Sequence, residues 1–122
     1  YLFIAHNLSV VKHMSDNIAV MYLGNIVELA SALDIYKTPL HPYTRSLISA
    51  IPIPVPGVRK EKRILKGDLP SPIHPPDGCR FHTRCPMVVP RCRIEKPVLR
   101  EIGAGGPGSV HQVACHRAEE VI

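Results

Sequence analysis

The residues of this 122-residue chain with the clearest potential for chemistry are its cysteines. Buried thiols can pair as disulfides, stay unrelated to one another, or bind a metal together as thiolates. Gly78 and Pro86 flank the first two cysteines and Pro90 precedes the third, which favours tight turns that point several thiolates at one centre. The four candidate ligands are Cys79, Cys85, Cys92 and Cys115, separated by five, six and twenty-two residues.

The cysteine spacing alone does not choose the metal. Structural zinc sites usually pair ligands about two to four residues apart, which is closer than the spacing here. Wider loops suit a larger object such as an iron–sulfur cluster, although the common ferredoxin spacings do not match either. Three nearby histidines, His82, His111 and His116, could each replace a thiolate at a zinc ion or lie at the surface.

Charge is concentrated around the cysteines. The whole net charge of +5 lies in residues 57–122, which hold twelve basic and seven acidic side chains. The arginines there can offset the charge of thiolates, and they also permit an alternative function, a small metal-clamped basic module that binds nucleic acid. With only two Phe and four Tyr in the chain, no interleaved aromatic and basic pattern supports base stacking, so we do not expect nucleic acid as a partner.

A second candidate site lies near the start of the chain. The apolar run at residues 1–5 predicts a buried, parallel strand, and His6 follows it directly. Ligands of parallel α/β folds bind at the carboxyl ends of strands, so His6 is placed to contact a phosphate oxygen or a water. Asn7 is a suitable N-cap for a short helix over residues 8–14.

The elements around these sites follow from periodicity and turn signals. Strand patterns over residues 17–23 and 26–30 predict a hairpin that turns at Gly24-Asn25. Ser31 caps a helix that runs through residue 36, Pro39 ends it, and another helix covers residues 44–50. Residues 63–66 suggest one further short strand within the proline-rich residues 52–97. With 13 prolines and no long apolar run, the chain is neither a helical bundle nor a transmembrane segment.

Several segments, in order, resemble known transport ATPases. Residues 3–28, with His6 inside Phe-Ile-Ala-His-Asn-Leu-Ser, resemble the switch-histidine region of ABC-transporter ATPases. Residues 38–47 resemble the His-Pro-Tyr segment of the oligopeptide/dipeptide subfamily, and residues 78–86 its C-terminal extension. The resemblance implies an α/β fragment: residues 1–51 end a P-loop ATPase core, and residues 52–122 form a small, proline-rich, metal-clamped α+β extension.

The resemblance also implies roles for single residues. His6 is the switch histidine that senses the γ-phosphate of ATP, although Asn7 stands where the family usually has Asp. His41 and Tyr43 fasten the core to the extension, and Tyr43 is a packing residue. The four cysteines hold a [4Fe–4S] cluster, with Zn²⁺ as the alternative, and its role is structural.

For the whole protein, the resemblance implies an ATP-binding subunit that uses ATP and Mg²⁺ to power peptide import. Its partners are a second ATP-binding subunit, two membrane permease subunits and, indirectly, an extracytoplasmic peptide-binding protein, and it works peripherally at the cytoplasmic face of the membrane. The sequence contains no phosphate-binding Gly-rich loop, signature loop or paired magnesium-binding carboxylates. We therefore expect a fragment that begins after those elements and neither binds ATP tightly nor hydrolyses it alone.

Overall fold

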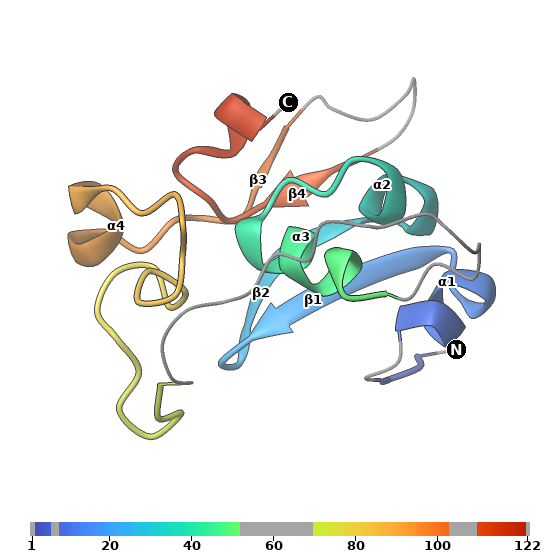
Figure 1. The fold of residues 1–122 in the computed structure, drawn as a ribbon, viewed down its shortest axis with the longest axis horizontal. Helices are drawn as coiled ribbons and strands as arrows, with labels where there is room; N and C mark the ends of the chain where they lie inside the picture. The colour runs from blue at the N-terminus through green and yellow to red at the C-terminus, as the bar shows by residue number, and fades with distance from the viewer. Residues whose placement is uncertain (1, 6–7, 52–69, 103–109, 122) are drawn as a thin grey trace, which may run out of the picture.

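The computed structural model describes residues 2–5, 8–51, 70–102 and 110–121. One four-stranded antiparallel sheet with short helices around it organises this part of the chain (Figure 1). The helices and strands in chain order are α1 (Leu8–Met14), β1 (Asn17–Tyr22), β2 (Asn25–Ser31), α2 (Ala32–Lys37), α3 (Pro42–Ser49), α4 (Pro90–Ile94), β3 (Arg100–Glu101), β4 (Gln112–Val113) and a final 3-10 helix (Ala118–Val121).

The predicted hairpin is confirmed, with its turn one residue earlier than expected. Strand β1 alternates exposed and buried residues, as a strand with one covered face does. The turn residues are Leu23 and Gly24, with φ of 47° and 77°. A two-residue turn of type I′ needs positive φ at both positions, and glycine satisfies this without strain at the second. Beyond the turn, Val27 forms a β-bulge, because Val20 pairs with Glu28 while Met21 pairs with Ile26.

Three short helices bury the apolar face of this hairpin. Helix α1 matches the predicted range, and α2 begins after the predicted cap, where Ser31 Oγ accepts from the N–H of Asp34 at 3.1 Å. Helix α3 begins two residues earlier than expected, with Pro42 in its first turn. The core joins the hairpin to these helices and to one distant side chain, Phe81. Its buried members are Val11, Ile18, Val20, Tyr22, Val27, Ala30, Ile35 and Phe81.

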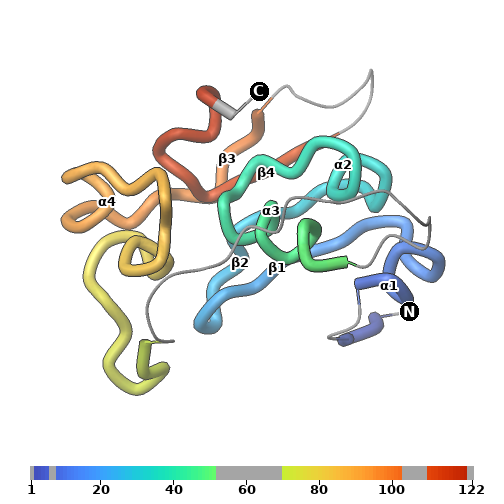
Figure 2. Tube along the Cα trace, viewed as in Figure 1, coloured from blue at the N-terminus to red at the C-terminus, as the bar shows by residue number. Residues whose placement is uncertain are grey.

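The chain after residue 70 returns to the same sheet. It runs out through a series of turns and α4, then comes back through β3 and β4 (Figure 2). Strand β4 pairs with β2, which gives the strand order β1-β2-β4-β3. Two strands of two residues each carry no readable periodicity, and the sequence did not predict them. The two predicted segments, residues 1–51 and 52–122, therefore share one sheet.

The strand expected at residues 1–5 is not observed. Residues 2–5 are irregular, and Leu2 and Ile4 are 92% and 86% exposed. A parallel strand needs a neighbouring strand to accept its backbone hydrogen bonds, and none of the described strands pairs with this segment. His6, Asn7 and the strand expected at residues 63–66 lie outside the described residues. Within the described ranges, every helix is too short or too polar to traverse a membrane.

Candidate metal centre

All four cysteines line one small cavity. Cys79 and Cys85 come from the turns after residue 78, Cys92 from α4, and Cys115 from the segment after β4. The cavity has a volume of about 10 Å³, roughly enough for one water molecule. All four are free thiols, so the disulfide alternative is wrong for this structure. The other lining residues are His41, Pro42, Phe81, His82, Met87, His116 and Arg117.

A glycine lets two of the cysteine segments approach each other. Gly78 has φ of 68°, and a Cβ atom there would lie 2.4 Å from the carbonyl oxygen of Cys92. The same close approach allows the N–H of Cys79 to donate to the Cys92 carbonyl at 2.8 Å. A side chain at residue 78 would clash with backbone atoms of α4, which cannot move aside as a flexible side chain can. Gly78 therefore sets the position of Cys79 against Cys92.

Backbone N–H groups point at three of the sulfurs. The N–H of Met87 donates to Cys85 Sγ at 3.3 Å. The N–H groups of Phe81 and Arg117 act in the same way on Cys79 and Cys115, and each donor follows its cysteine by two residues. Such bonds favour the thiolate over the thiol, because they place positive hydrogen atoms next to the developing charge.

Burial still outweighs these bonds for the free thiols. Burial raises the pKa of Cys85 to about 11, despite the hydrogen bond from Met87. It also raises the pKa of Cys79 and of Cys115, with the other cysteines adding to the rise. Within the described residues, no three His, Cys, Asp or Glu side chains are arranged to hold a metal ion. Cys79, Cys85 and Cys115 are thus protonated thiols, and their conversion to thiolates needs a positive partner.

The predicted histidine positions divide into two groups. His82 and His116 line the cavity, where His82 Nδ1 lies 2.8 Å from the Cys79 carbonyl and His116 Nε2 lies 2.7 Å from the Glu95 carbonyl. His111 does not: it is fully buried and its Nε2 lies 2.5 Å from Glu28 Oε1. His111 is therefore neither a cysteine-cavity residue that could ligate zinc nor a surface residue, the two roles expected from the sequence.

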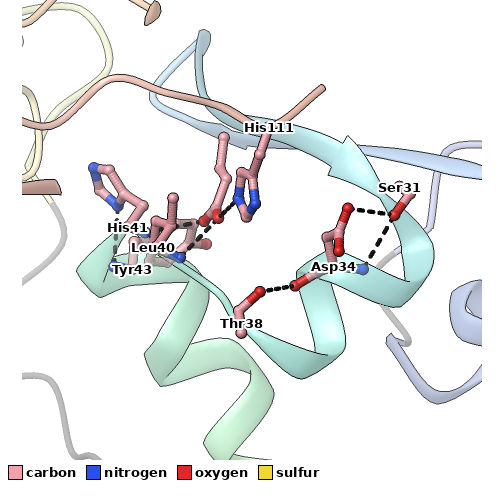
Figure 3. Close-up of polar contacts among 8 residues, drawn as sticks. Ser31, Asp34, Thr38, Leu40, His41, Tyr43 and His111 are labelled. Atoms are coloured by element: carbon pink, nitrogen blue, oxygen red, sulfur yellow. Dashed lines mark hydrogen bonds and ion pairs between the residues drawn. The ribbon is translucent and has the colours of Figure 1, made fainter. Parts of the chain in front are cut away.

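Glu28 is a buried carboxylate that the sequence analysis missed. Its side chain on β2 accepts from the backbone N–H of Leu40 at 2.8 Å and of His41 at 3.0 Å, in addition to its contact with His111. Figure 3 shows His111 reaching the start of α3 from the far end of the chain. Burial by itself raises the pKa of Glu28, but these hydrogen bonds outweigh it and the net pKa lies below the usual value. The negatively charged carboxylate of Glu28 thereby joins β2, the residues at the start of α3 and the segment that carries His111.

The predicted fastening role of His41 and Tyr43 is visible in their contacts. Both rings pack on Phe81, with centroids 5.6 Å and 5.4 Å from it, and Tyr43 also packs on Tyr22 at 4.8 Å. His41 is the N-cap of α3 and accepts at Nδ1 from the N–H of Tyr43 at 3.0 Å. Burial lowers the pKa of His41 to about 4, although Glu28 opposes this shift. The His-Pro-Tyr segment therefore adjoins both the hairpin core and the cysteine cavity.

The basic side chains near the cavity are largely engaged within the protein. Arg91 donates to Glu95 at 2.7 Å, and Arg117 Nη1 donates to the Met87 carbonyl at 2.9 Å. Arg100 binds Glu119, and its Nη2 also donates to the Cys115 carbonyl at 3.2 Å. Arginines thus tie together the segments that carry the cysteines, which is a structural use of the positive charge.

Known proteins match this chain along nearly its whole length. A model of the family described as the C-terminal region of oligopeptide/dipeptide transporters matches residues 27–92. The putative oligopeptide transport ATP-binding protein YkfD of Bacillus subtilis is 52% identical over 118 residues, which are 95% of this chain and 34% of that protein. The di/tripeptide transport ATP-binding protein DppF of Pseudomonas aeruginosa is 49% identical over 122 residues, all of this chain and 36% of that protein. The oligopeptide transport ATP-binding protein OppF of Escherichia coli is 52% identical over 121 residues, 97% of this chain and 34% of that protein.

These matches define the class of the chain. It belongs to the family of the C-terminal region of oligopeptide/dipeptide transporters. The chain spans about a third of the length of the curated relatives that it matches.

Proposed function

We propose that this chain is the C-terminal part of an ATP-binding subunit that powers peptide import by an ABC transporter. The main support is sequence similarity. Relatives named as peptide transport ATP-binding proteins are 49% to 52% identical to this chain over 95% to 100% of its length. In this proposal the whole protein binds and hydrolyses ATP with Mg²⁺ and pairs with a second ATP-binding subunit. The pair works peripherally at the cytoplasmic face of the membrane, beneath two permease subunits that receive peptide from an extracytoplasmic binding protein.

Within this chain, His6 is the residue we assign to the reaction. Its neutral imidazole contacts the γ-phosphate of ATP across the closed pair of ATP-binding subunits, and it thereby couples closure to hydrolysis. Support for this assignment comes from the position of His6 in a segment that resembles the switch-histidine region, two residues before Leu8, the first residue of α1.

The test uses the intact transporter in proteoliposomes loaded with peptide-binding protein. His6→Ala is expected to abolish ATP-driven peptide uptake and to leave ATP binding in place, because the remaining phosphate contacts lie elsewhere. His13→Ala is the matched control, since His13 is an exposed histidine seven residues further along. Uptake and hydrolysis at the level of the control in His6→Ala would refute the assignment.

We propose further that the cysteine cavity binds a [4Fe–4S] cluster through Cys79, Cys85, Cys92 and Cys115. Support comes from the four free thiols around one cavity and from the backbone N–H groups directed at three of the sulfurs. A bound cluster supplies positive iron that converts the thiols to thiolates and cross-links their four positions.

Metal analysis tests this proposal. The intact protein, purified without oxygen, is expected to contain about four iron atoms per chain and to absorb broadly near ~400 nm. Cys85→Ser is expected to lose the iron, whereas Ser71→Ala, an exposed control in the same region, keeps it. Stoichiometric zinc without iron would show that the site binds zinc and not a cluster. The absence of both metals would show that the cavity is not a metal centre.

A further inference from the structure

Tyr36 on α2 binds the first turn of α1, the helix that follows His6 in the chain. Its hydroxyl donates to the backbone carbonyl of Leu8, the first residue of α1, and accepts from the backbone N–H of Lys12. In an α-helix these two groups, four residues apart, are the partners of one backbone hydrogen bond. The Lys12 Nζ also lies 5.4 Å from the centroid of the Tyr36 ring. One side chain of α2 therefore holds both the backbone and a side chain of the first turn of α1.

Helix α1 depends on such contacts for its position. It has seven residues, and an isolated helix of this length is not stable in water. Its buried residue Val11 packs in the same core as Ile35 of α2. Just beyond its end, the carbonyl of Asp16 accepts from the N–H of Ala32, the first residue of α2, at 2.8 Å. Helix α2 thus fixes α1 at its start, at its middle and just past its end.

Helix α2 is itself held firmly at both ends. Ser31 caps its start through the N–H of Asp34, and at its end Thr38 binds the Asp34 carbonyl through its N–H at 2.8 Å and its hydroxyl at 3.4 Å (Figure 3). Ile35, next to Tyr36 in sequence, is 0% exposed and anchors the helix in the core of the hairpin. Tyr36 therefore presents its hydroxyl to α1 from a fixed element.

We propose that Tyr36 is a positioning residue for His6. This inference rests on the proposed function, which assigns His6 to the γ-phosphate of ATP. His6 precedes Leu8 by two residues, so the bond at the Leu8 carbonyl anchors the chain directly after the phosphate-sensing segment. An imidazole acts on a phosphate only when its nitrogen lies within hydrogen-bond reach of an oxygen, and an anchor this close limits the positions it samples. The hydroxyl of Tyr36 acts through the backbone of α1 and not by touching the nucleotide.

The test measures ATP hydrolysis by the intact transporter that carries Tyr36→Phe. Phe keeps the ring against the core and beside Lys12, and it removes only the hydroxyl. Tyr22→Phe is the matched control, because Tyr22 is buried and its hydroxyl has no hydrogen-bond partner among the described residues. The kcat and the KM for ATP are measured for both variants, for His6→Ala and for the wild type, together with amide hydrogen exchange in α1.

We expect Tyr36→Phe to lower kcat about fivefold, the factor that one net hydrogen bond represents, and to leave the KM for ATP unchanged. Amide exchange at Lys12 should become faster, because its N–H loses an acceptor. A kcat equal to that of Tyr22→Phe would overturn the inference. A raised KM with unchanged kcat would overturn it as well, since the hydroxyl would then serve ATP binding. If His6→Ala hydrolyses ATP at the wild-type rate, the assignment of His6 itself fails, which distinguishes that failure from failure of the Tyr36 inference alone.

Discussion

Residues 8–51 form one region and residues 70–102 with 110–121 form another, and the two are stabilised in different ways. The first region has long strands, capped helices and an apolar core on one face of a hairpin. In its described residues the second has a five-residue helix, a 3-10 helix and two strands of two residues, and its fixed points are a glycine-dependent close approach, arginine contacts and four converging thiols. A region with so little regular structure buries little apolar surface for its length, so cross-links must offset the entropy of ordering it.

The two regions contact each other through core side chains, a buried ion pair and backbone pairing. Phe81 inserts into the core of the hairpin, and Glu28 on β2 binds His111 from the second region. Strand β4 adds backbone pairing, and the N–H of Ala114 donates to the Val27 carbonyl at 2.8 Å.

Removal of the proposed metal should affect one region far more than the other. Metal binding in small metal-dependent domains contributes about 10 kcal/mol or more to folding. In the intact protein we expect chelation to bring amide hydrogen exchange in residues 70–102 and 110–121 close to that of an unprotected chain. Exchange in residues 17–31 is expected to stay slow, because hairpin pairing needs no metal. Equal loss of protection in both regions would show that they form one cooperative unit.

Loss of the buried carboxylate should destabilise the joint between the regions. Glu28→Ala leaves His111 and two backbone N–H groups buried without their acceptor, and we expect a loss of about 3–5 kcal/mol in the free energy of unfolding. Denaturant titration of the intact protein measures this. Glu101→Ala is the control, because Glu101 is exposed. A loss under about 1 kcal/mol would mean that water replaces these bonds.

Two glycines with positive φ give a matched pair across the regions. At Gly24, in the hairpin turn, a Cβ would meet nothing within 4 Å, so Gly24→Ala costs only backbone strain, about 1 kcal/mol. At Gly78 the same strain adds to a clash with the Cys92 carbonyl, and we expect a loss about 1–3 kcal/mol larger. Thermal unfolding of the two variants compares them. Equal destabilisation would show that the cysteine segments move apart freely.

Acid should weaken the joint through Glu28. Its pKa in the folded protein lies below its usual value of 4.5, so the unfolded chain binds more protons between the two values. The stabilisation is complete above about pH 4.5 and is lost as the pH falls through the folded pKa. Unfolding free energies of the wild type should therefore fall below that pH. Glu28→Gln, which cannot ionise, should lack this part of the slope, and an unchanged slope would argue against the carboxylate.

Local sequence signals predicted the first region well and the second region less well. Helix α1, the hairpin and the Ser31 cap follow from periodicity and from side chains near in sequence. The convergence of the cysteines follows from the residue types and their flanking Gly and Pro residues. The pairing of β4 with β2 and the partnership of Glu28 with His111 could not be predicted, because contacts across 83 residues leave no local pattern. Residues 2–5 show the opposite failure: their composition favours a strand, but strand formation needs a neighbour.

The bulge at Val27 constrains the length of the hairpin as well as its composition. Because β2 carries one residue more than β1 at this point, the adjacent Val27 and Glu28 are both buried, one in the apolar core and the other at the joint with His111. Deleting Val27 would remove the bulge and a core side chain, whereas a one-residue slip of β2 against β1 would turn the carboxylate to the other side of the strand. Homologous chains that retain Glu28 and His111 should therefore preserve the count of residues in this stretch even where the residues themselves vary.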